Sequence, residues 1–326
     1  MKKKLIPLSF ISLLALSSCA TGVHHDISEY ILSMNYRENF KILQLTDPHI
    51  GDKDNQKLHY DFMDLTIRDA NADLIVVTGD LFTFAGKTTA KRFCEFMDSY
   101  NTPWTVVFGN HDEQCYFSVD WLTNLLNNYS EYCLFKDIQD DDVTGNCNFA
   151  INLMDGTTIK EQIILMDTNR YYFGSYFGYD FVKENQQDWY DSLIEHTKTQ
   201  NGGTLVKSLL FTHIPLPEID TAYEYGLEHN TILGGTKEEK TCPPKYNSHF
   251  YDRIVIKGST NGIFFGHDHN NDFAVVDENN ITFSYGTKST DRIYYMETKL
   301  GGQTITLNND GTFNIDRIHH NYLEVN

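Results

Sequence analysis

The stretch FFGHDHNND, residues 264–272, places two histidines, two acids and two amides directly after an apolar run and one glycine. The run 262–265 is short and apolar, which is typical of a buried strand. Polar side chains aimed at the end of a buried strand are costly unless something binds them. The stretch therefore predicts a binding site at the tip of this strand.

Four earlier apolar runs end in the same way. These runs, at 40–45, 74–77, 104–108 and 208–211, lead into Thr46-Asp47-Pro48-His49, Thr78-Gly79-Asp80, Gly109-Asn110-His111-Asp112 and Thr212-His213. Taken alone, His213 would more often be a core histidine, and the cluster after 104–108 could be a simple turn. Open α/β sheets place ligands at the carboxyl ends of their strands. Five clusters at five strand ends therefore indicate one shared site.

Helical patterns at 58–70 and 88–100 separate the first three strands, which is the β-α-β-α-β order of a parallel sheet covered by helices. Further strands are expected at 163–166, 208–211 and 262–265, with helices at 186–197 and 250–256. From residue 272 onward, short alternating runs at 281–285, 293–297 and 304–307 predict an antiparallel meander. We expect one α/β (α+β) domain that contains two mixed sheets.

The composition and charge limit the classes of binding partner that we expect. The chain has 326 residues, 40% of them hydrophobic, and a formal net charge of -19. Such an acidic surface repels the phosphates of nucleic acids, so a nucleic-acid polymer is not expected as a partner.

The first residues predict export and a lipid anchor. Three lysines at 2–4 precede the short apolar run 5–16, and the sequence Leu16-Ser17-Ser18-Cys19 resembles a bacterial lipobox. We expect a lipoprotein signal peptide at 1–18, lipidation of Cys19, a tether at 19–37, and a domain at 38–326. The protein would then be an extracytoplasmic, membrane-anchored lipoprotein. An ordinary secretory signal is the alternative.

Five cysteines follow Cys19, and none of them forms a CxxC pair. Cys133 and Cys147 are the nearest candidates for a disulfide in an exported protein, whereas buried thiols are the simpler interpretation.

The clusters resemble the calcineurin-like metallophosphoesterases. The pattern D-x-H, G-D, G-N-H-[DE], H and G-H-x-H is met in order between Ile42 and His269. The stretches THIPLPE (212–218) and GHDHNNDF (266–273) are similar to a single-domain, purple-acid-phosphatase-like branch. This resemblance implies a four-layer sandwich of two mixed β-sheets flanked by helices, a dinuclear metal centre, and phosphoester hydrolysis.

The resemblance also implies the roles of individual residues. One metal would be held by Asp47, His49 and His269, the other by Asn110, His213 and His267, with Asp80 bridging the two. The ions would be two divalent or mixed-valence transition-metal ions, Mn, Zn or Fe, because imidazole suits such metals. The purple enzymes carry a tyrosine where this chain has Thr83. This difference weakens the preference for ferric iron.

His111 matches a family histidine that lies outside the metal ligands and binds a phosphate oxygen or protonates the leaving group. Its expected orienting partner is Asp80 or Asp112, and a turn residue is the alternative role. Asp112 and Asp272, with Asn271, are expected to steady the ligands by hydrogen bonds, with loop capping as the alternative. The aromatic run NRYYFGSYFGYD (169–180) either walls a substrate pocket or packs as a connecting loop.

The expected activity is hydrolysis of a small phosphorylated substrate, as a phosphomonoesterase outside the cytoplasm. A phosphodiesterase acting on cyclic nucleotides or lipid headgroups is the first alternative, and a catalytically idle binding lipoprotein is the second.

Overall fold

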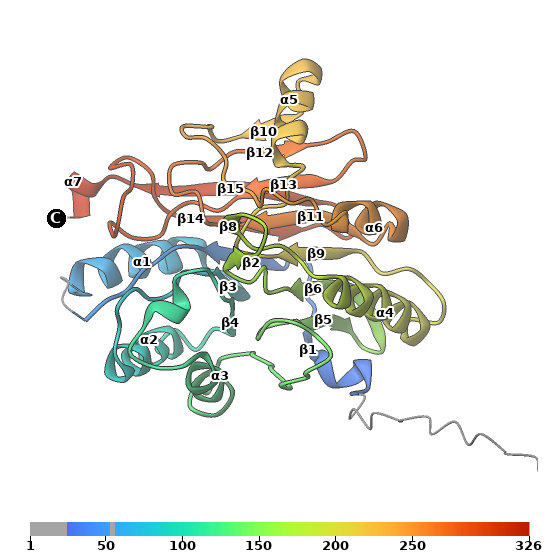
Figure 1. The fold of residues 1–326 in the computed structure, drawn as a ribbon, viewed down its shortest axis with the longest axis horizontal. Helices are drawn as coiled ribbons and strands as arrows, with labels where there is room; N and C mark the ends of the chain where they lie inside the picture. The colour runs from blue at the N-terminus through green and yellow to red at the C-terminus, as the bar shows by residue number, and fades with distance from the viewer. Residues whose placement is uncertain (1–24, 53–55, 326) are drawn as a thin grey trace, which may run out of the picture.

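The computed structural model describes residues 25–52 and 56–325. The expected signal peptide, Cys19 and the first part of the tether lie outside the described residues. Two mixed sheets face each other and helices flank them (Figure 1), which confirms the predicted fold class. No helix within the described ranges is both long and apolar enough to cross a membrane.

The smaller sheet has five strands in the order β15-β14-β2-β3-β4. Its parallel half is formed by β2 (Lys41–Leu45), β3 (Leu74–Thr78) and β4 (Trp104–Val107). The helices α1 (Gln56–Ala70), α2 (Lys87–Asp98) and α3 (Val119–Asn128) lie beside these strands (Figure 1). The predicted β-α-β-α-β unit is therefore present, and the hairpin of β14 (Leu300–Leu307) and β15 (Phe313–His320) extends it antiparallel to β2.

The larger sheet has eight strands in the order β1-β5-β6-β9-β11-β13-β12-β10. Their bounds are β1 (Ile31–Asn35), β5 (Phe149–Asp155), β6 (Thr158–Leu165), β9 (Ser208–Phe211), β10 (Ile232–Gly234), β11 (Thr260–Phe265), β12 (Ala274–Val276) and β13 (Thr282–Tyr285). The helices α4 (Glu184–Gln200), α5 (Ile219–His229) and α6 (Phe250–Lys257) share an apolar cluster with this sheet. A second apolar cluster joins the facing strands of both sheets.

Three expectations need correction. The 3₁₀ helix η1 (Ile27–Tyr30) and β1 precede residue 38, and β1 pairs with β5, so the folded domain begins before the expected boundary. Strand β13 lies parallel to β11, so the tail is only partly an antiparallel meander. Residues 293–297 form a loop, because Ile293 has a φ of 71° and the Tyr294 carbonyl accepts a hydrogen bond from His269.

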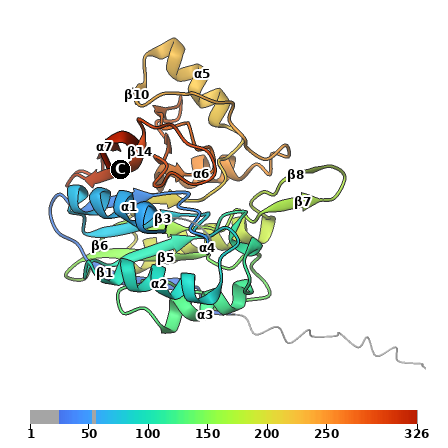
Figure 2. The ribbon, with the colours of Figure 1, turned by 90° about the vertical axis from the view of Figure 1, so that its left-hand side faces the viewer.

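A separate two-stranded hairpin, β7 (Tyr171–Phe173) and β8 (Phe177–Tyr179), projects from the body of the molecule (Figure 2). The short elements η2 (Asp112–Gln114) and α7 (Tyr322–Val325) complete the fold. The five described cysteines are free, so the candidate disulfide between Cys133 and Cys147 is not formed.

Candidate metal centre

All seven side chains predicted to bind metal lie together where the carboxyl ends of strands from both sheets meet. Asp47, Asp80 and Asn110 follow β2, β3 and β4, while His213 and His267 follow β9 and β11. Each of the seven residues is at most 7% exposed. The sequence therefore located the cluster, although its ligand roles stay a prediction.

One half of the cluster contains Asp47, His49 and His269 next to Asp80. The Nε2 atoms of His49 and His269 are 3.1 Å apart. The Oδ1 atom of Asp47 lies 3.4 Å from Nε2 of His269 and 3.8 Å from Nε2 of His49. One ligand atom from each of these four residues falls within 4.8 Å of the others, which is the spacing of a site for one ion.

The other half gathers around His213. Its Nε2 atom lies 3.2 Å from Oδ1 of Asn110 and 3.3 Å from Nδ1 of His267. The Oδ2 atom of Asp80 is 3.4 Å from Nε2 of His213 and 3.5 Å from Nε2 of His49. Asp80 thus touches both halves, as the predicted bridging carboxylate must.

The hydrogen bonds behind the histidines show that the cluster fits metal ions. Nδ1 of His213 contacts the carbonyl of Thr78 at 2.8 Å, and Nδ1 of His269 contacts the carbonyl of Tyr294 at 2.9 Å. Because a carbonyl only accepts, each Nδ1 carries the proton in the neutral ring, and the Nε2 lone pair points into the cluster. Oδ1 of Asp47 and Nε2 of His267 are buried without a hydrogen-bond partner. Of these two atoms, Oδ1 of Asp47 lies beside the Nε2 atoms of His269 and His49, and a buried carboxylate oxygen without a partner is stabilised by a cation.

The backbone is held in an unusual conformation at the same place. Asp47, His49, Asp80 and His267 have φ values of 52°, 48°, 51° and 78°. Non-glycine residues rarely adopt the left-handed region, and such strain concentrates at functional sites. The backbone also approaches its neighbours closely at Gly266, because a Cβ atom there would lie 1.9 Å from Oγ1 of Thr46.

Neighbouring charges shift the pKa values of the histidines in the cluster. Burial alone would lower the pKa of His213, but the adjacent Asp80 carboxylate raises that pKa to about 10. Burial, aided by the charge of His213, lowers the pKa of His267 to about 3.

His111 lies beside the cluster, and its ring meets the ring of His49 edge to face at 5.2 Å. Its backbone N–H donates to Oδ1 of Asp80 at 2.8 Å. The expectation that Asp80 or Asp112 orients the imidazole is wrong, because Nδ1 of His111 contacts Oε1 of Gln114 at 2.8 Å. This bond leaves Nε2 as the ring nitrogen that can serve a substrate.

Asp112 and Asp272, the two acids expected to steady the ligands, have different hydrogen-bond partners. Asp112 is buried and accepts the N–H groups of Gly109 at 2.7 Å and Phe82 at 3.1 Å, so it ties together the turns that carry Asn110 and Asp80. Asp272 contacts the Thr236 N–H at 2.8 Å and Nε2 of His319 at 2.9 Å. Its side-chain contacts within the described ranges reach no predicted ligand. These contacts agree with loop capping for Asp272.

The contacts of Asn271 also agree with loop capping. Its Oδ1 atom accepts the N–H groups of Glu238 at 2.9 Å and Glu239 at 3.0 Å. Its amide nitrogen lies 3.4 Å from Oδ2 of Asp268, between the two histidines of the turn. Asn271 therefore caps one loop and touches the histidine turn.

The supporting contacts of three side chains were not predicted from the sequence. Oγ1 of Thr83 contacts Nδ1 of His49 at 2.7 Å, at the position where the purple enzymes carry tyrosine. The buried Lys288 donates to the carbonyl of Asp47 at 2.6 Å, and burial lowers the pKa of its amine to about 8. The hydroxyl of Tyr171 accepts from Nδ2 of Asn110 at 3.0 Å, which turns the amide oxygen toward His213. In the sequence, Thr83 stood out only as the replacement of a tyrosine and Tyr171 only within the aromatic run 169–180, and Lys288 did not stand out.

Comparisons with known proteins agree with this geometry. Residues 40–271 match the model of the Calcineurin-like phosphoesterase family. The chain is 29% identical to "Probable inactive purple acid phosphatase 14" of Arabidopsis thaliana, over 80% of this chain and 73% of that protein. It is 28% identical to "Phosphatase DCR2" of Saccharomyces cerevisiae, over 76% of this chain and 47% of that protein.

Among solved structures, a dimetal phosphatase from Danio rerio has a similar fold. The TM-score is 0.54 at 14% identity, and the match covers 88% of this chain and 100% of that one. At this identity the likeness concerns the fold alone.

Proposed function

The chain belongs to the calcineurin-like phosphoesterase family, and on that basis we propose that it hydrolyses phosphomonoesters of small molecules at a dinuclear metal centre. The observation that carries this proposal is the complete set of seven buried side chains, which lie together and include the Oδ1 atom of Asp47 without a hydrogen-bond partner. Asp47, His49 and His269 would hold one ion, and Asn110, His213 and His267 the other, with Asp80 between them. The donor set suits Mn, Zn or Fe.

When bound, the two ions supply Lewis-acid polarisation of the phosphoryl group and acidify the attacking water. The chain itself positions these groups. Thr83, Thr78 and Tyr294 fix the rings of His49, His213 and His269 through their hydrogen bonds. Fixed rings reduce the reorganisation that each binding event requires.

His111 would handle the proton of the leaving group. Its Nδ1–H donates to Gln114, so a proton on Nε2 can pass to the ester oxygen as the phosphorus–oxygen bond breaks. The products would be an alcohol and inorganic phosphate. The partly buried position of His111 beside His49 supports this role.

A catalytically idle protein is the competing function, because the similar Arabidopsis protein is named as a probable inactive phosphatase. A phosphodiesterase, acting on cyclic nucleotides or lipid headgroups, is the alternative within the same chemistry. For this chain the set of predicted ligands is intact, which favours activity over idleness.

We further propose that Cys19 carries a lipid anchor and that the enzyme acts outside the cytoplasm on small phosphorylated compounds rather than on nucleic-acid polymers. The basic, apolar and Leu-Ser-Ser-Cys order of the N-terminus and the net charge of -19 support this placement.

The deciding experiment measures bound metal and hydrolysis together. Purified protein should contain close to two transition-metal ions per chain and hydrolyse monoesters faster than diesters. The Asp80→Asn variant should lose both metal and activity, whereas the control Thr105→Val, which removes a buried hydroxyl without a hydrogen-bond partner, should keep both. Full metal content without hydrolysis of any ester would support the idle protein. Faster cleavage of diesters would support the phosphodiesterase.

A further inference from the structure

We propose that the cavity between the β7–β8 hairpin and the loop 240–245 is a subsite for the leaving group, and that it binds a planar aromatic ring of a small phosphoester. This inference rests on the proposed hydrolysis, because the cavity adjoins the candidate metal centre. It names the substrate class that the hydrolysis would serve.

One face of the hairpin is a continuous aromatic surface. Tyr171 and Tyr179 are paired across the two strands, and their ring centres are 5.8 Å apart. The ring of Phe177 stacks on Tyr171 at 5.8 Å with an angle of 15° between the planes. Phe177 is 63% exposed, so its ring contributes little to the core and is free to meet a ligand.

The same face touches two of the predicted metal ligands. The Tyr171 hydroxyl accepts a hydrogen bond from Asn110 at 3.0 Å. The rings of Tyr179 and His267 meet edge to face with centres 4.2 Å apart. A group bound against these tyrosines would therefore lie next to a phosphoryl group held at the cluster.

The opposite wall is the loop 240–245, which includes Pro243 and Pro244. The loop is attached to the site, because the Cys242 N–H donates to Oδ2 of Asp268 at 3.2 Å. Lys245 donates to the Phe177 carbonyl at 3.2 Å and so joins the loop to the hairpin. Between these walls is a cavity of about 510 Å³, within the range of small-molecule sites.

The chemistry of the walls selects the ligand. Aromatic rings on one side and proline rings on the other favour a flat group that can stack, and such aromatic pairs contribute about 0.5–1.5 kcal/mol beyond area burial. Lys240 lines the cavity, is exposed and forms no ion pair among the residues that the structure describes, while the carboxylate of Asp220, which also lines it, is paired with Lys237. Its charge favours a ring that carries hydrogen-bond acceptors or a negative substituent.

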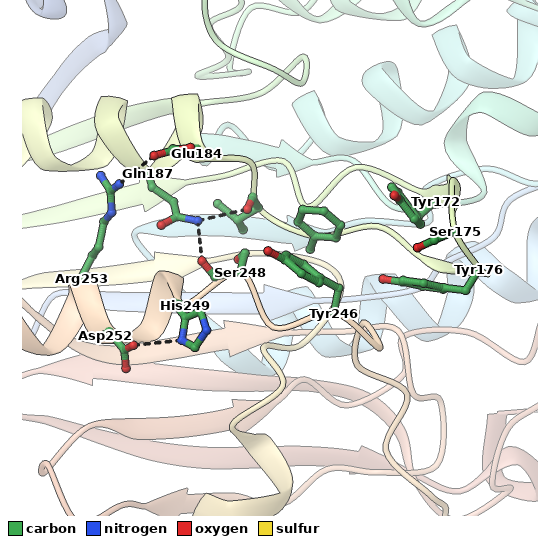
Figure 3. A pocket seen from close by; sticks show the side chains of 12 residues that line it. Tyr172, Ser175, Tyr176, Glu184, Gln187, Tyr246, Ser248, His249, Asp252 and Arg253 are labelled. Atoms are coloured by element: carbon green, nitrogen blue, oxygen red, sulfur yellow. Dashed lines mark hydrogen bonds and ion pairs between the residues drawn. The ribbon is translucent and has the colours of Figure 1, made fainter.

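A larger cavity on the other face of the hairpin, about 720 Å³, offers a weaker case. Figure 3 shows Tyr172 and Tyr176 at one end of it and Arg253 and His249 at the other. Among the described residues, none that lines it has a hydrogen bond or ring contact with a predicted metal ligand, whereas Tyr171 and Tyr179 of the first cavity do. Arg253 is also already paired with Asp188. This cavity is therefore not placed to hold part of an ester that reacts at the cluster.

The test compares two esters that differ in aromaticity but have leaving alcohols of similar size and basicity, benzyl phosphate and cyclohexylmethyl phosphate. The Phe177→Ala variant should lower kcat/KM for benzyl phosphate by about 2- to 12-fold, mainly through KM, and change the cyclohexylmethyl ester less than twofold. Phe173→Ala is the matched control, because Phe173 pairs with Phe177 across the hairpin and is 77% exposed but does not line the cavity. Circular dichroism checks that both variants are folded.

A binding measurement tests the subsite independently of the proposed hydrolysis. Benzylphosphonate, which is not hydrolysed, should bind the metal-loaded protein more tightly than cyclohexylmethylphosphonate, and Phe177→Ala should remove that preference in calorimetry. If this holds but no ester is hydrolysed, the subsite stands and the proposed function fails. Hydrolysis of both esters with no effect of Phe177→Ala, or an equal loss in Phe173→Ala, would overturn the subsite.

Discussion

The hydrogen bond between Thr83 and His49 allows a sharp test of how the metal centre is built. Thr83 is 3% exposed, His49 is fully buried, and Oγ1 lies 2.7 Å from Nδ1 of the imidazole. Thr83→Val keeps the side-chain shape and removes the only polar atom. The ring nitrogen is then left unpaired in the core, which costs about 1–3 kcal/mol.

The same bond holds Nε2 of His49 toward His269 and Asp80. Loss of such a support typically lowers metal affinity by about 10- to 100-fold, which equals about 1.4–2.8 kcal/mol and agrees with the cost of the unpaired nitrogen. We expect Thr83→Val to weaken binding of the metal that His49 would hold by that factor, and Thr83→Ser to restore most of the affinity because it keeps the hydroxyl.

The measurement is competition with a chelator of known affinity, followed by thermal unfolding of the metal-free protein. Thr105→Val is the matched control, since Thr105 is fully buried on β4 and its hydroxyl has no hydrogen-bond partner. If Thr83→Val binds metal within threefold of the native protein, the hydrogen bond does not position His49 and the reasoning fails. Equal losses in Thr83→Val and Thr105→Val would show a general packing effect instead.

Three further predictions follow from other parts of the chain. His111→Ala should keep both metals in elemental analysis but slow hydrolysis of alkyl esters by about 10²- to 10⁴-fold, with a smaller defect for nitrophenyl esters; equal defects for both would argue against proton donation. Burial raises the pKa of the Glu161 carboxyl from 4.5 to about 8, so the folded state binds the extra proton and stability falls as pH rises through that window. Glu161→Gln should therefore raise the free energy of unfolding at pH 9 by about 1–3 kcal/mol and leave it nearly unchanged at pH 4, as denaturant titrations would show; identical pH profiles would contradict this. Cys19→Ser should move the protein from the membrane fraction to the soluble fraction without loss of hydrolysis, and continued membrane binding would exclude the lipid anchor.

The cluster could be located from sequence because each predicted ligand directly follows a strand with a strong apolar pattern. The carboxyl ends of neighbouring parallel strands meet at one edge, so Asp47, Asp80 and Asn110 had to lie near one another once β2, β3 and β4 were recognised. The strand predicted at 293–297 is a loop in the structure, which shows where prediction from local patterns stops working. Its alternating residues fit a strand, but the Tyr294 carbonyl is used to orient His269, a contact that no local pattern encodes.

The supports of the site were missed because they depend on tertiary contacts. Gln114 could not be chosen over Asp80 or Asp112 as the partner of His111, since all three are close in sequence or in the expected site and only the turn geometry separates them. For Asp272, closeness in sequence to a predicted ligand suggested a supporting role that its contacts do not show. It follows His269 by three residues, yet its carboxylate contacts Lys299 and His319, two residues that are distant in sequence.

Lys288 stabilises the left-handed backbone conformation of Asp47, one of the predicted metal ligands. Asp47 has a φ of 52°, a conformation that costs energy for a residue with a side chain, and nothing in the sequence TDPH forces it. The buried Lys288 amine donates to the carbonyl of Asp47, and Thr46 pairs with Lys288 in an isolated bridge. A charge-assisted hydrogen bond to a backbone carbonyl is strong where water is excluded. The loop 286–292, which is more than two hundred residues away in sequence, therefore fixes the turn at the end of β2. This turn places the Asp47 carboxylate next to His269.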